Sequence, residues 1–251
     1  MKTAIIIGNG PSTKPLYEYG LKNIPEEIDT FCTSLAYRFC DELDFQPTYY
    51  VFADQKSVNM QKNNLKERIK KYKKTKTWFL CTDMCQDDFN EYSSEDKKQS
   101  KLIRVKHAGS GPMALNIAIN FFKYDRIFIF GLDHNYTWIK SLVEFTGFKN
   151  CAVYLNDVVN HPSYFFPRYL KKGDLVSWDM NAKDGEKVIK KCWVTEKIIN
   201  NGIKNGCQVI DFSDNIIPCP KANDLSIIFK NYSNSSQLEL KPDEIIHMKL
   251  N

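Results

Sequence analysis

The feature that most constrains the fold is a pair of glycine-rich loops, each of which lies next to an apolar segment. Residues 4–7, Ala-Ile-Ile-Ile, run directly into the loop 8–12, Gly-Asn-Gly-Pro-Ser. A continuous apolar run closed by glycines is typical of a buried strand in a parallel sheet. In the centre of the chain, the loop 109–112 opens the apolar segment 113–122, and the apolar run 126–130 follows. This alternation predicts an α/β fold, with a Rossmann-like, mainly parallel sheet flanked by helices.

The rest of the chain adds further elements to this framework. Four more runs have the apolar and β-branched character of strands: 30–33, 49–53, 78–81 and 206–211. We expect a solvated helix over 58–76, a surface loop over 86–101 and a helix over 185–204. Long irregular stretches in compact domains often serve as lids, so we interpret the aromatic-rich segment 138–180 as a lid. No repeat or linker is visible, which predicts one domain over residues 1–251.

Composition narrows the class of protein. The 251 residues are 43% apolar and 26% charged, which are globular values. The net charge of +5 is too small to imply nucleic acid. No apolar run reaches the roughly 18–20 residues of a membrane span, and the first apolar run is too short for a signal peptide. We therefore expect a cytoplasmic protein whose eight scattered cysteines are mostly small buried residues rather than disulfides or a zinc site.

Ligands of parallel α/β sheets bind at the carboxyl ends of the strands, and four features of this sequence would meet there. They are the loop 8–12, Asp54, the loop 109–112 and the pair at 133–134. The first loop is neither a dinucleotide fingerprint nor a P-loop. Glycines still let a backbone approach a phosphate, and a following helix start favours an anion. The alternative is that each loop is a tight turn with a cap, the second opening a helix at or after Pro112.

Two histidines are candidates for proton transfer. His134 follows a predicted strand, and His161 lies in the aromatic-rich segment. Either could take a proton from a hydroxyl near neutral pH, although a lone histidine is more often structural. No Asp-x-Asp motif is present to hold a metal against a nucleotide diphosphate. The lysine-rich run 62–76 is interpreted as a solvated face, with contact to an anionic membrane as the alternative.

The order of the motifs resembles a known family. Segment 5–12 resembles the opening of the bacterial sialyltransferases of glycosyltransferase family 42. It also resembles a wider family that includes motility accessory proteins and an archaeal pterin pyrophosphokinase. Three further segments agree in the same order: Pro-Thr-Tyr-Tyr-Val-Phe-Ala-Asp at 47–54, the Ser-Gly loop at 109–111, and the strand with Gly-Leu-Asp at 126–133. The resemblance covers residues 3–215.

This resemblance implies a Rossmann-like glycosyltransferase that takes a CMP-activated sugar and needs no metal or other cofactor. It places Asn9 and Ser12 near the donor phosphate and ribose, Ser110 and Gly111 against the nucleotide, and Asp133 at the closure of the pocket. With their neighbours, the expected donor-binding residues are Gly8, Asn9, Gly10, Ser12, Ser34, Asp54, Gly109, Ser110, Gly111, Asp133 and His134.

The resemblance also implies an inverting mechanism. His161 would be the general base on the acceptor hydroxyl, and Tyr136 and Tyr164 would stabilise the leaving phosphate. The partners expected are a nucleotide-sugar donor, with a CMP-linked nonulosonic acid favoured, and a glycan, lipid-linked or protein acceptor. Peripheral association with the inner face of the membrane and a homo-oligomer are both compatible with the sequence, whereas nucleic acid is not expected.

The chain departs from the sialyltransferases at two positions, since Ser34 and Asp54 stand where those enzymes carry asparagine. These departures place it nearer the wider family. Two alternatives therefore stay open. One is a Mg²⁺-dependent pyrophosphokinase in which Asp54 and Asp133 hold the metal. The other is a nucleotide-binding module without catalysis.

Overall fold

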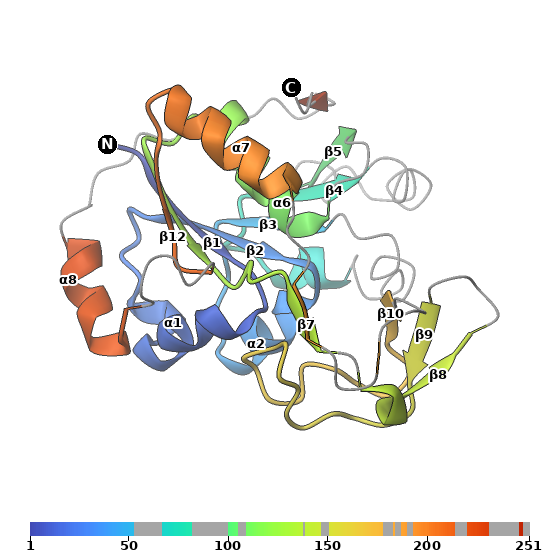
Figure 1. The fold of residues 1–251 in the computed structure, drawn as a ribbon. Helices are drawn as coiled ribbons and strands as arrows, with labels where there is room; N and C mark the ends of the chain where they lie inside the picture. The colour runs from blue at the N-terminus through green and yellow to red at the C-terminus, as the bar shows by residue number, and fades with distance from the viewer. Residues whose placement is uncertain are drawn as a thin grey trace.

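The chain folds around one large parallel sheet, drawn in Figure 1. The computed structural model describes residues 1–52, 67–81, 100–104, 109–137, 139–146, 151–177, 183, 187–189, 193–213, 220–230 and 246–247. In this part of the chain the sheet has eight strands, in the order β12 (Gln208–Asp211), β6 (Arg126–Phe130), β1 (Thr3–Ile7), β2 (Asp29–Thr33), β3 (Tyr49–Phe52), β4 (Thr77–Cys81), β5 (Ser100–Arg104) and β13 (Ile246–His247). Every neighbouring pair is parallel. The predicted α/β, Rossmann-like fold is therefore confirmed.

The strands are apolar because helices cover both faces of the sheet. All five residues of β1 are buried. Ile5 and Ile7 belong to one core cluster, whereas Ala4 and Ile6 belong to the other. This division follows from the alternation of side chains along a strand. It explains why the first strand reads as a continuous apolar run instead of an alternating one.

Two groups of helices form these cores (Figure 1). One face carries α1 (Lys14–Tyr19), α2 (Tyr37–Glu42) and α8 (Leu225–Lys230), with the 3₁₀ turns η1 (Pro11–Thr13), η2 (Leu21–Asn23), η3 (Ser34–Ala36) and η6 (Ala222–Asp224). The other face carries α6 (Ser110–Asn116), which continues as the π-helical turn η4 (Ile117–Phe121), and α7 (Trp193–Lys204). Cys32, Cys40 and Cys207 are free and buried in these two cores, and Cys151 is free and buried outside them.

The strand order places a topological switch point between β1 and β6. From β1 the chain builds β2 to β5 on one side, and then returns to place β6 on the other side. The two strands run in register from Thr3 opposite Arg126 to Ile7 opposite Phe130. The loops that follow them, at Gly8 and Gly131, therefore leave the sheet side by side. In open α/β sheets this is where ligands bind.

A second, smaller sheet lies beyond this edge (Figure 1). It pairs β8 (Val143–Phe145), β9 (Cys151–Tyr154) and β10 (Leu175–Ser177) in antiparallel fashion, with the 3₁₀ turn η5 (Lys140–Leu142) before it. A separate ribbon pairs β7 (Asn135–Thr137) with β11 (Lys187–Ile189). We call residues 139–146 and 151–177 the lid. The segment predicted to be irregular thus contains a short sheet.

Most predicted elements match the structure, and several boundaries were wrong. The helix expected at or after Pro112 begins at Ser110. The expected loop 86–101 ends inside a strand, because β5 begins at Ser100 and pairs with β4. The expected helix over 185–204 begins only at Trp193, since 187–189 form a strand beside β7. Of the expected helix 58–76, residues 58–66 lie outside the described residues, 67–71 are helical and 72–76 are not.

Candidate functional site

A cavity of about 390 Å³ opens at the switch point, between the sheet and the lid. Its size lies in the range of small-molecule sites, about 300–1,000 Å³. The residues that line it are Gly8, Asn9, Gly10, Thr33, Ser34, Leu35, Gly109, Ser110, Gly111, Pro112, Gly131, Leu132, Asp133, His134, Tyr136, Thr137, Tyr154, His161, Ser163, Tyr164, Tyr169, Leu170, Asp174, Leu175 and Val176. The structure therefore brings together all the predicted site residues except Ser12, which lies just behind the wall, and Asp54, which is outside the described residues.

The first glycine loop packs against the loop after β6. The Gly8 amide donates to the Phe130 carbonyl at 2.8 Å, and the Gly10 amide donates to the Gly131 carbonyl at 3.0 Å. A Cβ atom on Gly10 would lie only 2.0 Å from Oδ2 of Asp133. The close approach of the two loops is thus enough to require glycine at this position, whether or not a ligand binds there.

Ser12 joins the same contact. Its amide and its hydroxyl donate to Oδ2 of Asp133 at 3.1 and 3.0 Å, and its Oγ accepts from the Gly131 amide at 2.7 Å. These bonds hold Ser12 against the loop after β6, and its contact with a ligand stays a prediction. The amides of the first loop are also directed inward, since Thr13 donates to Gly10 as well. The loop therefore shapes the cavity instead of presenting a row of amides to a phosphate.

Asp133 is the ionisable carboxyl at this edge. Burial raises its pKa to about 6, and the repulsion of Asp211 adds to the effect, while the hydrogen bonds from Ser12 oppose it. A carboxyl group with this pKa exchanges its proton near neutral pH. Asp133 can therefore accept a proton from a ligand hydroxyl, which fits a general base.

Asn9 lines the cavity and has a buried acceptor beside it. Its Nδ2 faces the Thr33 carbonyl at 3.5 Å, which fixes the orientation of the amide. Its Oδ1 is buried and has no hydrogen-bond partner among the described residues. A buried acceptor without a donor is costly, so the Asn9 side chain is held here at the expense of an unsatisfied oxygen.

The second glycine loop contributes through shape. Gly109 is the extended residue before α6, and the helix begins at Ser110, which is buried in the cavity wall. A Cβ on Gly111 would lie 2.6 Å from Cδ2 of Leu132. Like the first loop, this one is held against the loop after β6, and both glycine loops meet at one point.

His161 comes from the lid and is 7% exposed. Its Nδ1 accepts a hydrogen bond from the Ser163 amide at 3.2 Å. Burial lowers its pKa to about 4. The ring is therefore neutral at physiological pH, and its proton lies on Nε2, because Nδ1 is used as an acceptor. This arrangement favours a hydrogen-bond donor over the general base that the resemblance implies.

His134 and Ser34 line the cavity with left-handed backbone, at φ 47° and φ 50°. His134 also shares a hydrogen bond between Nε2 and the Thr195 hydroxyl of α7, at 3.2 Å. Non-glycine residues in this conformation are strained, and such strain gathers at functional sites. The backbone is therefore strained just after β2, at Ser34, and after β6, at His134.

Tyrosines from β7 and from the lid line the cavity. Tyr136 and Tyr164, both predicted, are joined there by Tyr154 and Tyr169. Tyr164 stacks on Tyr169 with ring centroids 4.4 Å apart. Burial raises the pKa of Tyr154 and of Tyr169, so their hydroxyls stay protonated. The sequence signal for the two missed tyrosines was only the aromatic content of 138–180.

A buried ion pair fastens the lid to the sheet domain. Arg38 of α2 donates to both carboxylate oxygens of Asp174, with Nη2 to Oδ1 at 2.8 Å, and it also donates to the Tyr169 carbonyl. Each side chain is only 7% exposed. Asp174 lines the cavity, and its charge is neutralised by this contact. Among the described residues that line the cavity there is no lysine or arginine.

Two kinds of feature are absent from the described residues. They contain no group of three or more His, Cys, Asp or Glu side chains arranged to hold a metal ion. They also contain no helix that is long and apolar enough to cross a membrane. In comparisons with known proteins, no family model, no curated protein and no solved structure matches this chain.

Proposed function

We propose that the protein is a glycosyltransferase that moves a sugar from a CMP-activated donor to a hydroxyl of a glycan, lipid-linked or protein acceptor, without a metal. The observation that carries this proposal is the cavity at the switch point, where both glycine loops meet Tyr136 of β7 and a lid that bears His161 and Tyr164. The donor would be a CMP-linked nonulosonic acid.

The charges around the cavity support a monophosphate leaving group. A nucleoside diphosphate carries more negative charge and needs a cation or several cationic side chains to hold it. The described lining has only neutral donors, such as the hydroxyls of Tyr136, Tyr164 and Ser163. A CMP-linked sugar presents a single phosphate, which suits such a wall better than a diphosphate does.

The proposed reaction is a single displacement at the anomeric carbon. The bond from that carbon to the phosphate oxygen of CMP breaks through an oxocarbenium-like state, while a bond to the acceptor oxygen forms. Asp133 takes the proton of the acceptor hydroxyl. The Nε2–H of His161 and the hydroxyls of Tyr136 and Tyr164 donate to the departing phosphate. The configuration is inverted, as expected for one displacement.

The test is an assay of CMP release from CMP-N-acetylneuraminic acid, with lactose as acceptor and EDTA present. We expect release that depends on the acceptor, and loss of most of it in Asp133→Asn. Asp44→Asn serves as the matched control, because Asp44 is exposed and does not line the cavity. Consumption of ATP only with Mg²⁺, without CMP release, would instead favour pyrophosphoryl transfer.

A further inference from the structure

The segment Pro-Thr-Tyr-Tyr at 47–50 stands out in the sequence, yet Tyr50 does not line the cavity. We propose that Tyr50 is a positioning residue: its hydroxyl fixes the β2–α2 turn (residues 33–37) and holds Ser34 in its left-handed conformation, so that this turn can form one wall of the cavity. The inference rests on the proposed function only where CMP serves as the probe.

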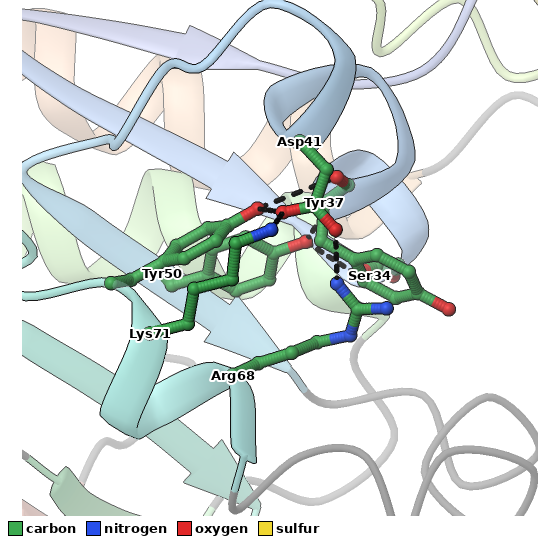
Figure 2. A network of polar contacts seen from close by, with 7 residues as sticks. Ser34, Tyr37, Asp41, Tyr50, Arg68 and Lys71 are labelled. Atoms are coloured by element: carbon green, nitrogen blue, oxygen red, sulfur yellow. Dashed lines mark hydrogen bonds and ion pairs between the residues drawn. The ribbon is translucent and has the colours of Figure 1, made fainter.

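The hydroxyl of Tyr50 joins the two ends of the β2–α2 turn, as Figure 2 shows. It donates to the Ser34 carbonyl at 2.6 Å and accepts from the Tyr37 amide at 2.8 Å. Tyr50 lies opposite Cys32 in the β2–β3 pairing, and Cys32 precedes Ser34 by two residues. The neighbouring strand thus supplies both hydrogen bonds from a fixed point.

Tyr50 is itself held rigidly. Its side chain is completely buried, and its ring stacks on Trp78 with centroids 4.3 Å apart and an angle of 17° between the planes. Tyr72 packs its edge against the same ring at 6.3 Å. Burial raises the pKa of Tyr50 well above its ordinary value, so the hydroxyl keeps its proton and remains a donor. A buried donor in a fixed place can hold a strained partner.

The partner is strained and faces the cavity. Ser34 has φ 50°, a conformation that costs an L-residue energy and that glycine adopts freely. Thr33, Ser34 and Leu35 all line the cavity. Without the bond from Tyr50, Ser34 would be free to relax towards negative φ, and the wall formed by these three residues would move with it.

A second polar network lies on the outer side of the same turn (Figure 2). Asp41 accepts hydrogen bonds from Arg68 at 2.6 Å, Lys71 at 2.8 Å and Tyr72 at 2.9 Å. The guanidinium of Arg68 also lies 3.4 Å from the centre of the Tyr37 ring. This network ties α2 to the segment before β4, but none of its members lines the cavity. Of these two sets of contacts, only that of Tyr50 includes a described residue that lines the cavity, Ser34.

The first test needs no ligand. In Tyr50→Phe, hydrogen–deuterium exchange of residues 34–37 should rise about tenfold or more, because the Tyr37 amide loses its acceptor. Tyr124→Phe is the matched control: it removes another buried phenol bond, to Asp29 at 2.5 Å, away from this turn. Unchanged exchange at 34–37 in Tyr50→Phe would overturn the proposal, and so would an equal rise in Tyr124→Phe.

The second test measures the affinity for CMP. Tyr50→Phe should weaken it about tenfold, and Tyr124→Phe should leave it unchanged. In the background of Ser34→Gly the effect of Tyr50→Phe should shrink to about threefold or less, because glycine adopts positive φ without support. This double variant also serves if Tyr50→Phe alone does not fold. An undiminished effect in the glycine background contradicts the positioning role. If the unmodified protein does not bind CMP, the proposed donor fails, and the exchange comparison still decides the role of Tyr50.

Discussion

Ser12 donates two hydrogen bonds, one from its amide and one from its hydroxyl, to the same carboxylate oxygen of Asp133. Since Ser12 follows β1 and Asp133 follows β6, this contact joins the two strands that flank the switch point. Ser12 also reaches the Ser213 hydroxyl at 3.5 Å, which in turn accepts from the Leu132 amide. The loops after β1 and β6 are therefore connected by hydrogen bonds, so a substitution in one loop should disturb the other.

Gly10→Ala should damage this unit. The new Cβ would lie 2.0 Å from Oδ2 of Asp133, where only a shift of the loop could relieve it. We expect a loss of roughly 1–3 kcal/mol in the free energy of unfolding, measured by urea denaturation. Gly109→Ala is the control, because that Cβ has space and the backbone φ is −70°. Equal stability of the two variants would contradict the close packing described here.

Asp133 should impose a pH dependence on stability. Its folded pKa of about 6 lies above the ordinary value of 3.8, so the folded state holds the proton longer than the unfolded chain does. Its contribution to stability is therefore greatest below pH 4 and falls as the pH rises to 6. The free energy of unfolding of Asp133→Asn, minus that of the unmodified protein, should rise by about 1–3 kcal/mol across this window. A difference that stays flat from pH 4 to 6 contradicts the raised pKa.

His161 should act in the opposite direction. Its pKa falls from 6.5 to about 4, so the unfolded chain binds the proton first, and the stability it contributes is lost as the pH falls from 6.5 to 4. His161→Gln should flatten this acid limb of the urea midpoint. A variant that keeps the whole limb would show that the ring is not held neutral by burial.

The kinetic role of His161 can be separated from its stability. As a donor to the leaving phosphate, it should support kcat by about 100-fold, which His161→Gln would reduce. The acid limb of kcat/KM near pH 6, assigned to Asp133, should remain in this variant. Disappearance of that limb in His161→Gln would restore the role of general base to the histidine.

Two arginines fasten the lid to α2, and they should differ in effect. Arg38 pairs with Asp174 in a site where both side chains are 7% exposed, so Arg38→Met leaves a buried charge without a partner. We expect a loss of about 3–5 kcal/mol. Arg168 pairs with Glu42 at 3.3 Å, with exposures of 65% and 45%. Arg168→Met should cost less than about 1 kcal/mol in the same denaturation experiment. Similar losses in the two variants would mean that burial of the pair does not matter.

The fold could be predicted because its strands are buried on both faces. Runs such as 4–7 and 126–130 have no polar alternation, and each ends at a glycine. The strands that were missed or misplaced have weaker signals. β5 begins with Ser100 and Lys101, and β11 is only three residues long, Lys187–Ile189, so local pattern favoured a loop and a helix. These segments form strands because they pair with other strands, β5 with β4 and β11 with β7.

The location of the site could also be predicted, because the carboxyl ends of parallel strands meet at one edge. The contacts between residues far apart in the sequence could not be predicted. Nothing in the loop 8–12 shows that Ser12 turns toward Asp133, 121 residues away. The pair of Arg38 and Asp174 is equally invisible, because charged residues at those positions read as ordinary surface. The tautomer of His161 depends on the Ser163 amide, a contact made only in the folded lid.

The central claim is that the cavity binds a CMP-linked donor without a metal, and a thermal-shift comparison of nucleotides tests it most directly. CMP, CDP, UDP, GDP and ATP would each be added with EDTA and with Mg²⁺, since a ligand of the native state raises the melting temperature by mass action. We predict stabilisation by CMP that is the same with EDTA and with Mg²⁺. Stabilisation by ATP only when Mg²⁺ is present, with none by CMP, would contradict the proposal.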